Sequence, residues 1–85
     1  MDINKNVIIK NICYTDLVYG RINRKLSLNL NKSEIEEFIS GLLKETSEKY
    51  YSRIGKNYYV SNIERNIRVT INANTFRIIT ADRLS

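Results

Sequence analysis

The sequence predicts an α+β fold, in which N-terminal helices pack on a small C-terminal antiparallel β-sheet in two layers. Apolar residues recur at helical spacing through the first half of the chain, and from Tyr50 onward they alternate with polar residues, as in strands. A run of helices followed by a run of strands is typical of α+β domains. The 85 residues contain no proline and no glycine-rich linker, so we expect a single domain over residues 1–85.

The first third of the chain is predicted to be helical. Ile8 and Ile12 share one helical face, and Thr15 or Asp16 can cap a second helix through a side-chain oxygen. The apolar residues of this second helix recur at helical spacing, and they are Leu17, Val18, Ile22 and Leu26.

A third helix is predicted over residues 33–47. Ser33 with Glu36 three residues later matches a capping box, in which each side chain accepts a hydrogen bond from the backbone amide of the other residue. An apolar stripe follows at helical spacing, formed by Ile35, Phe38, Ile39, Leu42 and Leu43. We expect this stripe to cover the apolar face of the sheet.

Two short strands are predicted over residues 50–54 and 58–62, because both segments are rich in tyrosine and flank a turn that contains Gly55. The alternative for residues 50–54 is the tail of the preceding helix followed by a loop. A second turn is expected over residues 62–66. A closing hairpin follows over residues 67–81, with its turn at Ala73 and Asn74.

The closing hairpin is the most informative stretch, because it separates apolar from polar side chains. A two-residue turn would place Val69 opposite Ile78 and Thr70 opposite Arg77. Strand alternation then assigns to the core face Ile67, Val69, Ile71, Phe76, Ile78 and Thr80. It assigns to the other face Arg68, Thr70, Asn72, Thr75, Arg77 and Ile79.

The polar face of this hairpin is the candidate ligand site. Guanidinium groups bind phosphate in a bidentate manner, hydroxyls add hydrogen bonds, and a nearby tyrosine can stack on a base. The residues that we expect to bind an anion are Arg68, Thr70, Thr75, Arg77, Tyr59 and Lys56. The alternative interpretation is an ordinary sheet surface that faces solvent.

The composition favours a negatively charged partner. The net charge is +5 and the pI is about 9.5, and an excess of Lys and Arg attracts nucleic acid, a nucleotide or an acidic protein surface. The alternative is that mild basicity only aids solubility. Ile, Asn and Lys have AT-rich codons, and their abundance suggests a bacterium of low GC content or one of its phages or mobile elements.

Several classes of chemistry lack the residues that they need. The chain has no histidine and a single cysteine, Cys13, so neither a zinc site nor a histidine-activated nucleophile is expected. No glycine motif for phosphate or dinucleotide binding occurs, and we expect no cofactor and no metal. No apolar segment reaches the roughly 20 residues that span a bilayer. No signal peptide is recognisable, so we expect a cytoplasmic protein without membrane contact.

Two runs of residues, NICYT at residues 11–15 and ERNIRVTINANTFRIIT at residues 64–80, carry a resemblance to a known family. On these runs the chain resembles a family of small, uncharacterised bacterial proteins with one domain of unknown function, and the resemblance covers most of the chain. It implies no activity. In the order of its elements alone, the chain is also similar to ribonuclease toxins of the RelE and barnase–colicin type, some of which use Arg, Lys and Tyr in place of histidine.

Three functions are consistent with these observations. The first is a small non-enzymatic basic protein that binds nucleic acid, a nucleotide or an acidic protein surface through the cationic sheet face, for example as a defence inhibitor of a phage or mobile element. The second is a histidine-free endoribonuclease of toxin type, in which the phosphate would be held by Arg68, Arg77, Lys56 and Tyr59. The third is a protein–protein adaptor or homodimer that uses an uncovered helix face or an open sheet edge.

Overall fold

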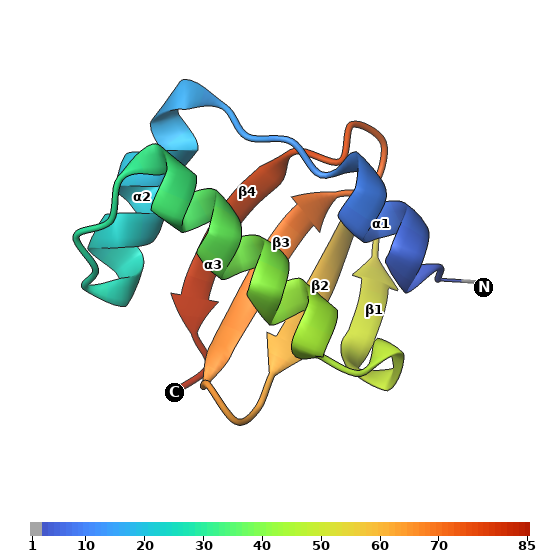
Figure 1. The fold of residues 1–85 in the computed structure, drawn as a ribbon. Helices are drawn as coiled ribbons and strands as arrows, with labels where there is room; N and C mark the ends of the chain where they lie inside the picture. The colour runs from blue at the N-terminus through green and yellow to red at the C-terminus, as the bar shows by residue number, and fades with distance from the viewer. Residues whose placement is uncertain (1–2) are drawn as a thin grey trace.

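The computed structural model describes residues 3–85 and confirms the predicted α+β fold class. Helices come first and an antiparallel four-stranded sheet comes last (Figure 1). The helices are α1 (Lys5–Asn11), α2 (Asp16–Leu26) and α3 (Lys32–Glu45), followed by a short 3₁₀ helix, η1 (Glu48–Tyr50). The strands are β1 (Tyr51–Ile54), β2 (Asn57–Asn62), β3 (Ile67–Asn72) and β4 (Ile78–Arg83). Within residues 3–85, no helix is long and apolar enough to cross a membrane.

Helix α3 begins with a capping box that lies two residues before the predicted one. The Asn31 side chain accepts a hydrogen bond from the Glu34 amide at 2.9 Å, and the Asn31 amide donates to the Glu34 carboxylate at 2.9 Å. The predicted box of Ser33 and Glu36 is therefore wrong. The box that forms has the same spacing, with an N-cap side chain three residues before a glutamate. The helix ends at Glu45, and the ammonium of Lys5 then donates to the carbonyls of Lys44 and Thr46 at 2.7 and 2.6 Å.

The apolar stripe of α3 forms the centre of the core, as predicted. Its four buried members are Ile35, Ile39, Leu42 and Leu43, and Phe38 is half-buried against them. Helix α2 contributes Val18, Ile22 and Leu26 to the same cluster, whereas Leu17 lies outside it with a side chain that is 80% exposed. Helices α1 and α3 lie in front of the sheet, and α2 lies beside β4 (Figure 1).

The sheet is a meander in the order β1-β2-β3-β4, in which each strand pairs with the next. Residues 55 and 56 connect β1 to β2, and Gly55 has φ of 60°, which suits the first central residue of a type II′ hairpin turn. The predicted turn before β3 is also present over residues 63–66. The inward side of the sheet is apolar and buried, through Tyr51, Val60, Ile67, Val69, Ile71, Ile78 and Ala81.

The predicted two-residue turn of the closing hairpin is wrong. β3 ends at Asn72 and β4 begins at Ile78, so that residues 73–77 form a longer loop. The cause is the Asn72 side chain, which accepts hydrogen bonds from the amides of Asn74 and Thr75 at 2.8 and 2.9 Å. This local turn competes with the tighter hairpin. Phe76 takes a positive φ of 61° to close the loop, and it is half-buried instead of lying in a strand.

The longer loop shifts the register of β4. Thr70 is opposite Thr80 and not Arg77, and Val69 is opposite Ala81 and not Ile78, with a bulge next to Thr70. Thr80 therefore leaves the core face to which the sequence assigned it, and Ala81 takes the inward position, where it is fully buried. A bulge inserts one extra residue into one strand, which changes the facing of the residues that follow it.

The N-terminal segment closes the same end of the sheet. The Cys13 amide donates to the Phe76 carbonyl at 3.0 Å, and the Ile78 amide donates to the Cys13 carbonyl at 2.9 Å. Cys13 and Arg77 thus form an isolated parallel bridge. The loop of residues 73–77 is fixed on one side by Asn72 and on the other by this bridge.

Replacing Asn31 by alanine should lower the free energy of unfolding by about 1 kcal/mol, because the side-chain hydrogen bond to the first turn of α3 is lost. Urea unfolding followed by circular dichroism measures the change. Ser33→Ala is the matched control, since Ser33 takes no part in the capping box. A loss confined to Ser33→Ala would instead place the cap at the residue that the sequence suggested.

Candidate functional site

The outward side of the sheet is the surface that can meet a ligand. Cross-strand partners share a face, so the register aligns the outward residues in three rows. We call this surface the open face, and its residues are Ser52, Ile54, Asn57, Tyr59, Ser61, Arg68, Thr70, Asn72, Thr80 and Asp82. Helices α1 and α3 lie on the other side of the sheet, and in the part of the chain shown in full no helix lies behind β1, β2 and β3 (Figure 1).

Three of the six predicted site residues meet on the open face. Tyr59 is opposite Thr70 in the central row, and the Arg68 guanidinium carbon stands 5.7 Å from the centroid of the Tyr59 ring. Thr70 is 7% exposed, because it lies between these larger neighbours. Arg68 is exposed, so its hydrogen-bond donors face solvent while its charge interacts with the ring. The arrangement combines a cation with an aromatic surface.

The other three predicted site residues lie at one end of the sheet. We call this end the loop end, and it consists of the β1–β2 turn and the loop of residues 73–77. The Ala73 amide donates to the Lys56 carbonyl at 2.7 Å, which holds the two segments together. The Thr75 hydroxyl accepts from the Arg77 amide at 3.3 Å. Asn72 and Arg68 are four residues apart in β3, so the loop end lies about 13 Å from Arg68 along the strand.

The charge around these residues is one-sided. Residues 49–63 and 65–81 contain no Asp or Glu, and they carry the cations Lys49, Arg53, Lys56, Arg65, Arg68 and Arg77. Asp82 is the acid on the open face, opposite Arg68, and its carboxylate binds the Lys25 ammonium at 3.2 Å. The open face therefore carries one cation, Arg68, opposite one acid, Asp82, and its other residues are uncharged, whereas the loop end carries Lys56 and Arg77 without a neighbouring acid in the sequence.

Several arginines that could belong to a basic groove instead stabilise the fold. Arg21 donates to the Ile79 carbonyl and Arg83 donates to the Leu26 carbonyl, both at 3.0 Å, so both join α2 to β4. Arg65 forms an ion pair with Glu45. Among the described residues, the side chains of Lys56, Arg68 and Arg77 form no ion pair, so these cations are available for a ligand.

The open face also contains polar residues that the sequence argument did not select. Asn57 is opposite Asn72, in the row next to Tyr59. The Asn57 side-chain oxygen and the Thr80 hydroxyl are buried and find no hydrogen-bond partner within residues 3–85. Strand alternation in β2 was the signal that could have placed Asn57 on this face. The position of Thr80 depends on the bulge, which no sequence pattern indicates.

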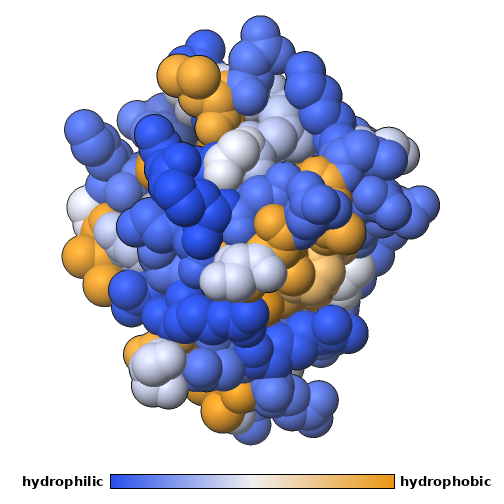
Figure 2. Space-filling view, turned by 90° about the vertical axis from the view of Figure 1, so that its left-hand side faces the viewer, coloured by the Kyte–Doolittle hydropathy of each residue, from blue (hydrophilic) through white to orange (hydrophobic). Residues whose placement is uncertain are grey.

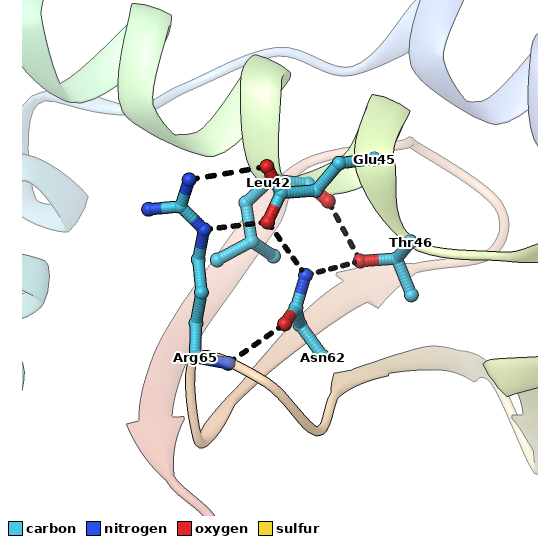
Figure 3. Close-up of polar contacts among 5 residues, drawn as sticks. All are labelled: Leu42, Glu45, Thr46, Asn62 and Arg65. Atoms are coloured by element: carbon cyan, nitrogen blue, oxygen red, sulfur yellow. Dashed lines mark hydrogen bonds and ion pairs between the residues drawn. The ribbon is translucent and has the colours of Figure 1, made fainter.

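A second polar cluster joins the end of α3 to the β2–β3 turn (Figure 3). The side-chain NH2 group of the buried Asn62 donates to the Thr46 hydroxyl at 2.9 Å and to the Glu45 carboxylate at 3.1 Å. The side-chain oxygen of Asn62 accepts from the backbone N–H of Arg65. The Thr46 hydroxyl donates to the Leu42 carbonyl at 2.7 Å. An open cleft of about 610 Å³ lies beside the cluster. Since its members bind one another, we assign the cluster to stability.

Glu45 and Arg65 shift each other's protonation. The hydrogen bond from the Arg65 guanidinium holds the pKa of the Glu45 carboxyl below its ordinary value of 4.5, with further support from the Asn62 amide. The same hydrogen bond raises the pKa of Arg65. Both groups are therefore charged at neutral pH, as an ion pair requires.

An aromatic cluster lies between the segment before α2 and α3. The rings of Tyr14 and Tyr19 stack with centroids 5.6 Å apart, and Tyr19 donates to the Glu36 carboxylate. This hydrogen bond raises the pKa of Tyr19 to about 12, and burial raises the pKa of Tyr14. The Lys32 ammonium stands 5.3 Å from the Tyr19 centroid. The Tyr19 hydroxyl thus has a hydrogen-bond partner within the protein. The Tyr14 hydroxyl is buried without a partner among residues 3–85.

The remaining surface features offer less to a ligand. The exposed large apolar residues are scattered over different elements, and they are Val7, Leu17, Tyr50, Ile54 and Ile63. Figure 2 shows the side of the molecule around α2 as mostly hydrophilic, with apolar side chains in separate patches. Cys13 is exposed, and its thiol donates to the Thr75 carbonyl at 3.6 Å. Within residues 3–85, no three His, Cys, Asp or Glu side chains gather in a way that could hold a metal ion.

Comparison with known families matches residues 6–82 to the family described as "Protein of unknown function (DUF3781)". The match covers nearly the whole chain, including both runs of residues on which the resemblance was based. Neither the curated proteins nor the solved structures contain a match to the chain.

Glu45→Gln should destabilise the protein at neutral pH, and the destabilisation should shrink as the pH falls. The folded-state pKa of Glu45 lies below the ordinary value of 4.5, so its contribution to stability is present above that value and is lost as the pH falls through the folded-state pKa. Urea unfolding of wild type and variant across this pH range measures the difference in their free energies of unfolding. Glu37→Gln, an exposed acid on α3, is the control. A difference in unfolding free energy that stays constant into the acid range would contradict the ion pair.

Proposed function

Since this chain belongs to the DUF3781 family of proteins of unknown function, we propose a function from its own geometry: it is a small, non-enzymatic protein that binds nucleic acid through its cationic sheet surface. The observation that carries the proposal is a set of three cations on the open face and at the loop end that form no ion pair among residues 3–85, namely Lys56, Arg68 and Arg77. Cations without a carboxylate partner retain their attraction for phosphate.

The shape of the cationic surface supports a polymer as the ligand. Arg68 lies on the open face, whereas Lys56 and Arg77 lie at the loop end, about 13 Å away along β3. A chain of phosphates can contact both groups at once, with the arginines as bidentate donors and the lysine as a point charge. Such contacts position the ligand and carry no sequence information.

An acidic protein surface is the alternative ligand, because carboxylates bind the same cations. A tyrosine lies beside a cation on the open face, since Arg68 stands over the Tyr59 ring, whereas the similar pair of Arg53 and Tyr58 lies in the inward row with Ile71. Aromatic rings beside cations favour nucleic acid, whose bases stack on them. We therefore prefer nucleic acid.

The proposal fits a cytoplasmic protein of a bacterium or of a phage or mobile element, where nucleic acid is abundant. The single cysteine and the high content of Ile, Asn and Lys agree with such a source. Nucleic-acid binding would suit an accessory role, such as the inhibition of a host defence system.

Binding of a labelled single-stranded oligonucleotide should weaken steeply with salt, because each phosphate contact releases a counterion. Fluorescence anisotropy across a salt series measures this. Arg68→Ala combined with Arg77→Ala should weaken binding roughly tenfold and reduce the slope of log K against log salt by about 1.4. The matched control is Arg24→Ala combined with Lys44→Ala, which removes the same charge from α2 and α3. Salt-independent binding, or an equal loss in the control, would count against the proposed surface.

The same experiment separates binding from cleavage. After long incubation at high protein concentration, an RNA ligand should remain intact on a denaturing gel. Shortened RNA that depends on Arg68 would support the histidine-free endoribonuclease instead. An acidic polypeptide that displaces the oligonucleotide at lower concentration than unlabelled oligonucleotide would favour the acidic protein surface.

A further inference from the structure

We infer that the open face binds single-stranded nucleic acid in preference to duplex, with Tyr59 and Arg68 as the platform on which a base stacks. The inference rests on the proposed function and names the form of nucleic acid that this surface takes.

The width of the sheet disfavours a duplex. Adjacent strands lie about 4.8 Å apart, so the outer strands of this four-stranded sheet are about 14 Å apart. The major groove of B-DNA is about 12 Å wide and admits a helix or a two-stranded ribbon. The open face is therefore too wide to enter the groove. An extended single strand, in contrast, can lie across the open face with its bases turned toward the sheet.

The Tyr59–Arg68 pair provides the stacking surface. Tyr59 lies in the central row on β2, and its neighbours in that row, Ser52 and Thr70, are too short to cover its ring. The ring is half-buried, which fixes its orientation, and the Arg68 guanidinium stands 5.7 Å from its centroid. Splayed bases of single strands stack on tyrosine rings and on guanidinium planes, whereas the bases of a duplex are already stacked on one another.

The neighbouring row offers hydrogen bonds to a base edge. The Asn57 side-chain oxygen is buried without a partner among the described residues. The NH2 group of the same side chain donates to the Tyr59 hydroxyl at 3.5 Å, at the long limit for a hydrogen bond. An unpaired buried acceptor is unfavourable, so rotation of the Asn57 side chain toward a bound base would exchange this long hydrogen bond for one that gives the oxygen a partner. The opposite residue, Asn72, uses its side-chain oxygen for the loop of residues 73–77, so only its side-chain NH2 group remains to donate to a base.

The cations give the bound strand a path. Lys56 and Arg77 hold phosphates at the loop end, the Asn57 row and Tyr59 follow, and Arg68 lies in the third row. These groups stand in line along β2 and β3, so a single strand that runs with these strands meets phosphate and base contacts in turn.

Anisotropy with one fluorescent oligonucleotide, free or annealed to its complement, tests the inference. Wild type should bind the single strand roughly tenfold more tightly than the duplex. Tyr59→Leu should lose most of this preference with an unchanged salt slope, and Tyr59→Phe should retain it. Tyr50→Leu is the control, since Tyr50 is an exposed tyrosine of η1, outside the open face. Heparin, a polyanion without bases, should bind wild type and Tyr59→Leu equally.

Photocrosslinking keeps the test independent of how well the leucine variant folds. A strand containing 5-bromodeoxyuridine, irradiated with the wild-type protein, should crosslink to the peptide that contains Tyr59. Equal binding of single strand and duplex, together with crosslinks outside β2 and β3, would overturn the inference and leave the proposed function standing. Failure of wild type to bind any nucleic acid would overturn both.

Discussion

The burial of the α3 stripe against the inward side of the sheet determines which strand residues remain for a ligand. Ile39 and Leu43 of α3 are fully buried. Val60 of β2 and Val69 of β3 are also fully buried and belong to the same core. Since side chains alternate along a strand, burial of Val69 sends Arg68 to the other side. A register slip by one residue would bury the Arg68 guanidinium without an ionic partner, at a cost of several kcal/mol. The same packing that stabilises the core therefore exposes the cation.

Two groups of basic residues have different roles. Arg21, Arg65 and Arg83 each bind a carbonyl or a carboxylate of a neighbouring element, so their charge helps to hold α2, α3 and the β2–β3 turn in place. Lys56 and Arg77 have no such partner among residues 3–85, and neither has Arg68. Other cations without an ion pair among these residues lie on the helices, namely Lys10, Arg24 and Lys44. Lys56, Arg68 and Arg77 differ from them in their place, on the open face and at the loop end.

The sequence predicted the elements well where one periodic pattern dominates, as in the α3 stripe and in β3. It failed where two local solutions compete. Both Asn31 with Glu34 and Ser33 with Glu36 match a capping box, and the first of them forms. The residue before it, Leu30, is held by the Asn23 side chain, a contact that no periodic pattern in the sequence indicates. The candidate site was predicted in part. Strand alternation predicts the facing of Tyr59, Arg68 and Thr70. Thr75 and Arg77 lie at the loop end and not in a strand, because the Asn72 side chain stabilises a longer loop.

The central claim is that the open face and the loop end form one binding surface, opposite the helices. A titration of ¹⁵N-labelled protein with a single-stranded oligonucleotide, followed in heteronuclear NMR spectra, tests it most directly. The account predicts chemical-shift changes for Tyr59, Arg68 and Thr70 together with Lys56 and Arg77, and unchanged signals along α3. Changes that centre on α3, or on the cleft beside Glu45 and Arg65, would contradict it.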